Sequence, residues 1–308
     1  DWATRPYTNA KVQENYSRRF SIRFPNEELP AGRPLRTTPI YDKMLTAGAQ
    51  MGESYGLEVP LWFAPEGIKD KFSWRRSTDF ENVAAEVKAV RERVGLLEIS
   101  GFAKYSVVGS GAADWLDLIL ACRIPKPGRM TLAPMLNQNG KLIGDFTLSN
   151  LDSEEFYIIG SGIAEEYHLR WFEESLTEHL PETADVQVIP HGTGIVGLSI
   201  AGPKSYELLS KVTDEDVSKT AFRFMDIRKM EIGNASCLVG RVSYTGDLGY
   251  ELWMEADVQR YVLELLQKDG EEFGIRSFGL RALNALRLEK NYGSWAREYR
   301  PIYGPYEA

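Results

Sequence analysis

An aspartate inside a predicted β-strand is the first residue whose type and position could support chemistry. Asn139-Gly140 is a two-residue hairpin signal, and the apolar strand that follows it, residues 141–149, carries Asp145 near its middle. Aspartate has a low strand propensity, and a carboxylate that faces inward must be solvated, paired or used. A positioned carboxylate can act as a general base. The pattern alone favours the alternative, a strand-edge or surface aspartate.

A tyrosine and a glutamate flank a glycine-bounded bend further along the chain. Residues 241–253 predict a strand, a bend at Gly246-Asp247-Leu248-Gly249 and a second strand, with Tyr244 and Glu251 at the two ends of the bend. A carboxylate there could accept two N–H donors from a planar amidine-like or pterin ring. The alternative is a core tyrosine with a solvated strand glutamate, and the residues alone do not separate the two interpretations.

Two basic side chains lie on a helix that the sequence predicts after Gly279. Arg287 and Lys290 could together hold an acidic ligand tail. A solvated basic face is the more frequent meaning of such charges.

Two glycine-rich turns imitate a dinucleotide-binding fingerprint. Each follows a predicted strand and precedes a helix, at residues 109–114 and 160–165. Both lack the third glycine and carry a carboxylate in its place, Asp114 or Glu165, where a pyrophosphate would lie close. The sequence therefore argues against nucleotide binding, and a flavin or nicotinamide would have to bind elsewhere.

Composition excludes several classes of protein. The 308 residues are 43% hydrophobic and 26% charged, which is typical of a soluble folded chain. A net charge of −8 disfavours nucleic acid as a partner. The only cysteines, Cys122 and Cys237, are too few for a disulfide framework, the three histidines show no metal-ligand spacing, and a reducing compartment fits best. No apolar run approaches the roughly 20 residues of a membrane span.

The beginning of the chain differs in character from the rest. Residues 1–80 are rich in proline, arginine and aromatic residues, and only residues 40–49 have helical spacing. We expect an extended arm on a neighbouring surface, followed by an amphipathic helix at residues 80–94. Because the chain begins with Asp1 and ends with Ala308, we also expect it to be a piece of a longer protein.

The remaining residues carry an internal duplication. A strand, a tight turn and a helix at Gly109 recur 93 residues later at Gly202. Each unit is followed by strands and a second helix, at residues 130–135, 141–149, 156–160 and 164–179 in the first half and 228–232, 236–244, 250–255 and 258–273 in the second. The pattern predicts two α+β modules with helices on antiparallel sheets, at residues 81–190 and 191–308.

At these segments the sequence resembles the folate-binding aminomethyltransferase family, typified by the T-protein of the glycine cleavage system. The motifs are residues 136–140 leading to 145–147, residues 244–251 and residues 286–290. Segments in the arm, at residues 24–28, 31–34 and 60–63, are similar to the region that follows the flavin domain in dimethylglycine and sarcosine dehydrogenases. The resemblance covers almost the whole chain.

The resemblance implies a cloverleaf of three modules around a folate pocket, of which the duplicated halves would supply two. A third, β-rich module would follow the last residue, and a flavin domain that holds FAD would precede the first or belong to a partner subunit. Tetrahydrofolate is the implied cofactor. No nucleic acid or membrane partner is expected, and the compartment would be the cytoplasm, or the mitochondrial matrix in a eukaryote.

The family's chemistry implies a role for each candidate residue. The flavin domain would oxidise an N-methylated glycine to an iminium, which is lost as formaldehyde unless tetrahydrofolate traps it as methylene-tetrahydrofolate. By motif match, Asp145 would position and deprotonate the bridging nitrogen of the folate. Glu251 would accept the N–H edge of the pterin and Tyr244 would flank the ring. Asn137 and Arg287 are assigned to the folate site by the same match.

Three positions depart from the T-protein pattern. Lys141 replaces the second of two paired glycines, Asp247 replaces a glutamate in the bend, and Leu283 aligns with an arginine that contacts folate in the T-protein. Two alternatives to a one-carbon transfer module stay open. The chain could be a folate-binding or assembly module without turnover, or a folate-dependent demethylase of another methyl donor, against which the dehydrogenase-like arm argues.

Overall fold

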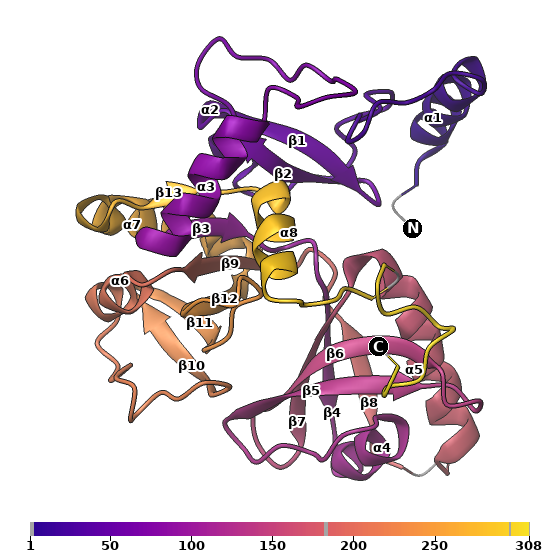
Figure 1. Ribbon diagram of the computed structural model, residues 1–308. Coiled ribbons are helices and arrows are strands. Elements are labelled where there is room, and N and C mark those ends of the chain that lie inside the picture. Colours follow the sequence, from indigo (N-terminus) through magenta and orange to yellow (C-terminus); the bar gives the residue numbers. More distant parts are fainter. Residues whose placement is uncertain (1–2, 182–183, 296, 308) are drawn as a thin grey trace.

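The computed structural model describes residues 3–181, 184–295 and 297–307. Asp1 and Ala308, the two ends of the chain, lie outside these residues. The described chain forms two large sheets with helices on their outer faces, and a two-stranded hairpin with further helices packed above them (Figure 1). The predicted combination of sheets and helices is therefore present.

The first large sheet is antiparallel and has five strands in the order β5-β6-β7-β4-β8. Its strands are β4 (Ala103–Val108), β5 (Arg129–Leu136), β6 (Leu142–Asn150), β7 (Glu155–Gly160) and β8 (Gln187–Pro190). Helices α4 (Ala112–Ile119) and α5 (Glu165–His179) cover one face, with the short helix η1 (Gly162–Ala164) before α5. Aromatic rings dominate the core between helices and sheet, where Phe172 contacts Tyr105, Trp115 and Phe146.

The second large sheet has six strands in the order β10-β11-β12-β9-β3-β13. They are β3 (Gly95–Glu98), β9 (Ile195–Ala201), β10 (Ile227–Ile232), β11 (Ala235–Gly240), β12 (Gly249–Glu255) and β13 (Arg276–Ser277). Its helices are α6 (Ser205–Val212), η2 (Ala256–Val258), α7 (Gln259–Gly270) and η3 (Glu271–Phe273). The strand order β10-β11-β12-β9 corresponds to β5-β6-β7-β4 in the first sheet.

Strand β3 was not predicted, and it crosses the expected division of the chain. It lies within residues 81–190 but pairs with β9 and β13 in the sheet built mainly from later residues. A second difference concerns the strand predicted at residues 236–244, because β11 ends at Gly240 and Tyr244 lies in the following bend.

The N-terminal region is more ordered than the predicted arm. It contains α1 (Arg5–Ser17), α2 (Tyr41–Thr46) and a hairpin of β1 (Ala49–Ser54) and β2 (Leu57–Phe63), of which only α2 was expected. Helix α1 buries none of its residues, so it has no apolar periodicity to detect, although Thr4 caps its first turn. Pro60 obscured β2, and it is tolerated because it pairs at a register shift in a two-stranded hairpin.

A buried carboxylate joins this hairpin to two helices. Glu86 of α3 (Phe80–Glu92) is 0% exposed and accepts hydrogen bonds from the backbone N–H groups of Phe63 at 2.7 Å and Gly279 at 3.0 Å. Gly279 precedes α8 (Leu280–Glu289), which lies beside α3 in Figure 1. A Cβ atom at Gly279 would lie only 2.1 Å from the carbonyl oxygen of Leu61, so glycine is required there.

Helix α8 in turn packs where the two large sheets face one another. An apolar cluster joins side chains of both sheets to this helix, including Leu97 of β3, Tyr157 and Ile159 of β7, Trp253 of β12, and Leu283 and Leu286 of α8. Side chains on the facing surfaces of the two sheets therefore share one interior layer.

Replacing Glu86 by leucine should destabilise the protein. The substitution would leave two buried N–H groups without acceptors, and each such group costs about 1–3 kcal/mol. We expect the free energy of unfolding, measured by urea denaturation, to fall by about 2–4 kcal/mol. Lys88→Leu, on an exposed part of the same helix, is the control and should change it by less than about 0.5 kcal/mol. Equal effects of the two substitutions would contradict this account of Glu86.

Candidate active site

Asp145 lies on the face of the first sheet that is turned toward the second. Along β6, Phe146 and Leu148 point into the core under the helices, so Asp145, Thr147 and Ser149 point the other way. Thr147 and Ser149 pair with Ile159 and Tyr157, two residues of the layer between the sheets. Because residues paired across strands share a face, Asp145 belongs to the edge of this layer.

The surroundings of Asp145 disfavour its charge. Burial raises the pKa of Asp145 to about 7, and a hydrogen bond from its own backbone N–H offsets only part of this effect. Among the described residues, no cation forms an ion pair with this carboxylate. Asp145 therefore has the pKa of a group that can take up and release a proton near neutral pH.

Glu251 lies on the face of the second sheet that is turned toward the first, in the layer between the two sheets. On β12 it alternates with Tyr250 and Leu252, which point into the core under α6 and α7. Its neighbours across the strands are small, Ser199 on β9 and Gly240 on β11. Burial raises the pKa of Glu251 to about 7, and a hydrogen bond with the Trp253 side chain opposes that shift.

Tyr244 lies near both Asp145 and Arg287. Its hydroxyl donates to the carbonyl oxygen of Gly293, and its ring stacks on Tyr292 with centroids 6.1 Å apart. Burial raises the pKa of Tyr244 to about 12, with Arg287 lowering it and Asp145 raising it further. The phenol of Tyr244 is therefore close enough to Arg287 and Asp145 for their charges to change its pKa.

Arg287 is buried and already has partners in the chain. Its guanidinium donates to the carbonyl oxygen of Tyr292 at 2.8 Å, to the carboxylate of Glu298 at 3.0 Å and to Asn284 Oδ1 at 3.1 Å. It is 3% exposed. Its assignment to an acidic ligand tail stays a prediction, and such a tail would have to share this arginine with Glu298.

Asn137 stabilises the turn between β5 and β6. Its Oδ1 accepts hydrogen bonds from the backbone N–H groups of Asn139 at 2.9 Å and Lys141 at 3.0 Å. These contacts fix the hairpin that aligns β6. The structure therefore brings Asp145, Tyr244 and Arg287 together, sets Glu251 on the facing sheet, and places Asn137 at the end of the hairpin.

Sequence reasoning missed the C-terminal segment that passes from α8 to β6 (Figure 1). Trp295 packs against His168 and Tyr167 of α5, with ring centroids 5.0 and 5.8 Å apart. The carbonyl oxygen of Tyr303 accepts a hydrogen bond from the N–H of Leu142 at 2.9 Å. Repeated aromatic residues after position 290 were the available signal, but nothing in the sequence identifies the surface that they cover.

The first glycine-rich turn is filled by the chain itself. Asp185 Oδ2 accepts hydrogen bonds from the Ser110 backbone N–H at 3.1 Å and from the Ser110 hydroxyl at 3.2 Å. Gly109 has φ +123°, and a Cβ atom there would lie 2.1 Å from the carbonyl oxygen of Asp185. A carboxylate thus occupies the N-terminal end of α4, where a phosphate would bind in a nucleotide site. Within the described ranges, no cluster of three metal-ligating side chains occurs, and no helix is long and apolar enough to cross a membrane.

A family model, curated sequences and a solved structure all relate this chain to aminomethyltransferase domains and to dehydrogenases that contain them. The family described as the GCVT N-terminal domain matches residues 40–308, and the FAD dependent oxidoreductase central domain matches residues 1–38. The chain is 35% identical to mitochondrial dimethylglycine dehydrogenase of Mus musculus, over 100% of this chain and 35% of that protein. It is 30% identical to 4-methylaminobutanoate oxidase (formaldehyde-forming) of Paenarthrobacter nicotinovorans, over 99% of this chain and 37% of that protein. The structure of glycine cleavage system aminomethyltransferase T from Bartonella henselae superposes with a TM-score of 0.73 at 22% identity, covering 88% of this chain and 67% of that one.

The chain belongs to the GCVT N-terminal domain family, the aminomethyltransferase domain. The resemblance to dimethylglycine and sarcosine dehydrogenases is confirmed, and the fold is that of the glycine cleavage T-protein. The chain spans about 35% of the length of the curated dehydrogenase that it matches over its whole length.

The raised pKa of Asp145 predicts a pH-dependent stability. Between about pH 4 and pH 7 the unfolded chain has released this proton while the folded chain retains it, so the free energy of unfolding falls as pH rises. Asp145→Asn removes the effect and should stabilise the protein at pH 8 by on the order of 1–2 kcal/mol, with solvent access discounted. Urea denaturation at pH 5 and pH 8 measures it, with the exposed Asp117→Asn as control. A pH 8 stability no higher in Asp145→Asn than in the control would contradict the prediction.

Proposed function

We propose that this chain binds tetrahydrofolate between its two large sheets and captures the one-carbon unit released by oxidative N-demethylation of a methylated glycine. The observation that carries the proposal is the pair of carboxylates, Asp145 and Glu251, on facing sheets. Both side chains are partly buried, and the resulting desolvation raises the pKa of each to about 7. Buried acids of this kind are found where a protein binds N–H donors or transfers protons.

The residues fit a folate in chemical type. Tetrahydrofolate supplies two nitrogens that can hold one carbon between them. Glu251 would accept the N–H edge of the pterin, in the space left by its small neighbours Ser199 and Gly240. Tyr244, which lies within electrostatic reach of Asp145, would flank the ring. Asp145 would hold the proton that the bridging nitrogen gives up.

The basic residue of the site suits the acidic end of the same ligand. Arg287 is buried beside Tyr244, and its present partner Glu298 is a carboxylate on the C-terminal segment. A glutamate tail presents the same chemical group, so it could take the place of Glu298 or share the guanidinium with it. Asn137 would act indirectly, through the hairpin that positions β6.

The source of the one-carbon unit is proposed from the relatives. Several of them are named as dehydrogenases or oxidases of N-methylated amines, and residues 1–38 match a domain of FAD-dependent oxidoreductases. We infer that a flavin domain, in the same parent chain or in a partner subunit, oxidises dimethylglycine or sarcosine and passes the iminium to this chain. The strand orders that correspond between the sheets support two duplicated modules of a folate-binding cloverleaf. The cytoplasm or the mitochondrial matrix remains the expected compartment.

Calorimetric titration with tetrahydrofolate tests the binding site. We expect micromolar binding to the chain, and at least a tenfold loss of affinity in Glu251→Ala, which corresponds to about 1.4 kcal/mol. Glu231→Ala, an exposed glutamate of the same sheet, is the matched control and should bind like the wild type. Equal affinity in both variants would remove Glu251 from the site, and absence of binding to the folded wild-type chain would refute the proposal for this chain.

The catalytic role of Asp145 is tested by Asp145→Asn. The chain is mixed with tetrahydrofolate and with a flavoenzyme that oxidises dimethylglycine, and methylene-tetrahydrofolate is measured against free formaldehyde. We expect the variant to keep its folate affinity but to slow capture by about 100-fold or more, the scale of a positioned acid–base group. Capture unchanged from that of Asp117→Asn would leave a folate-binding module in which Asp145 has no part in the reaction.

A further inference from the structure

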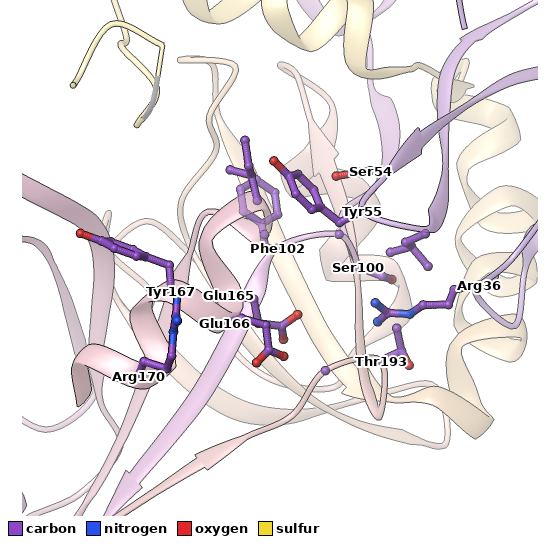
Figure 2. A pocket seen from close by; sticks show the side chains of 15 residues that line it. Arg36, Ser54, Tyr55, Ser100, Phe102, Glu165, Glu166, Tyr167, Arg170 and Thr193 are labelled. Atoms are coloured by element: carbon purple, nitrogen blue, oxygen red, sulfur yellow. The ribbon is translucent and has the colours of Figure 1, made fainter. Parts of the chain in front are cut away.

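A separate pocket lies where five segments of the chain converge (Figure 2). Five segments contribute to its lining: Arg36 before the hairpin, Tyr55 after β1, Phe102 between β3 and β4, Thr193 between β8 and β9, and four residues at the start of α5, namely Glu165, Glu166, Tyr167 and Arg170. We call it the hairpin pocket. Its volume is about 260 Å³, which is below the roughly 300–1,000 Å³ of pockets for drug-sized ligands and therefore suits a smaller molecule.

The hairpin pocket is distinct from the proposed folate site. Asp145, Tyr244, Glu251 and Arg287 are absent from its lining. It also lies at the junction of the two family matches, since Arg36 falls within residues 1–38 and the rest of the lining falls within residues 40–308.

Charges of both signs face one another across the hairpin pocket. Figure 2 shows the guanidinium of Arg36 directed toward the carboxylates of Glu165 and Glu166, with Thr193 beside the gap. Lys104 adds positive charge beneath the floor, where its Nζ donates to the carbonyl oxygens of Ser100 at 2.8 Å and Phe102 at 2.7 Å. Both of those residues line the pocket.

This layout selects against a ligand with a single charge. An anion that bound Arg36 would meet Glu165 and Glu166, and a cation that bound the glutamates would meet Arg36 and Arg170, the second cationic residue of the lining, with Lys104 behind the floor. A small molecule with one charge of each sign satisfies both sides. Tyr55 and Phe102 also line the pocket, and aromatic faces are the usual surroundings of methylated ammonium groups.

We propose that the hairpin pocket binds a small zwitterion, with its carboxylate toward Arg36 and Thr193 and a methylated ammonium toward Glu165 and Glu166. The choice of an N-methylated amino acid rests on the proposed function, because the relatives are named for such substrates. The requirement for a zwitterion rests on the charges of the pocket alone.

Titration of the chain followed by NMR of the N-methyl or methyl protons tests the proposal. The probes are N,N-dimethylglycine, trimethylammonium as the cation alone, and propionate as the anion alone. We expect dimethylglycine to bind at least about tenfold more tightly than either singly charged probe, since each of them forfeits a charge-assisted contact. Comparable affinities for all three probes, or no binding of dimethylglycine, would overturn the proposal.

Substitutions in the hairpin pocket test whether dimethylglycine binds there. Glu166→Gln and Arg36→Gln should each weaken dimethylglycine binding by about tenfold or more. Glu174→Gln, on α5 but outside the hairpin pocket, is the matched control and should bind like the wild type. If folded Glu166→Gln and Arg36→Gln chains, checked by circular dichroism, bind dimethylglycine as the control does, the pocket is not the site. Tetrahydrofolate affinity is measured on the same samples. Failure to bind dimethylglycine with normal tetrahydrofolate binding overturns the zwitterion proposal alone, whereas failure to bind tetrahydrofolate overturns the proposed folate site.

Discussion

The buried carboxylate of Glu86 is the interaction on which the arrangement of the candidate site depends. It satisfies two backbone N–H groups, one at the end of β2 and one at the start of α8, in an interior where an unpaired donor is costly. Glycine at position 279 lets the helix begin in contact with the strand. Helix α8 then packs at the junction of the two large sheets and carries Arg287 beside Tyr244, so Glu86 connects the hairpin to the helix that lies between the two walls of the candidate site.

The candidate site differs from the core, because it places two carboxylates where the core places apolar side chains. Burial shifts the pKa of Asp145 and that of Glu251 from the ordinary carboxylate range to about 7, without a cation held in an ion pair with either group among the described residues. Such desolvation weakens the folded state at neutral pH, and a ligand that supplies N–H donors reverses the effect. Two buried cationic groups are held by hydrogen bonds within the chain, Arg287 by Glu298 and Lys104 by two carbonyl oxygens. Burial also raises the pKa of the structural carboxylate Glu86 to about 7, but Glu86 accepts hydrogen bonds from two backbone N–H groups of other segments, whereas Asp145 and Glu251 lie on the facing surfaces of the two sheets.

The sequence predicted the parts of the fold that have local signals. Asn139-Gly140 marked the β5–β6 hairpin, and apolar periodicity marked α3, α5 and α7. Helix α1 has no buried face, Pro60 disguised β2, and β3 consists of four buried residues whose partners lie about a hundred positions away, so none of these could be read locally. The same distinction holds at the site. Motifs pointed to Asp145, Tyr244 and Glu251 as candidates, whereas Glu298 and Trp295 make contacts that only the folded chain creates.

The pairing of β3 with β9 has a consequence for how the chain folds. Residues 103–190, which make the whole five-stranded sheet, are inserted between two adjacent strands of the other sheet. Bringing β3 to β9 closes a loop of about one hundred residues, an entropic cost that is greatly reduced once the intervening segment is compact. The five-stranded sheet, whose strand pairs lie closer in sequence, is therefore the part suited to form first, both in refolding and as the chain leaves the ribosome. Its completion brings β3 within reach of β9, the first of the five later strands of the other sheet.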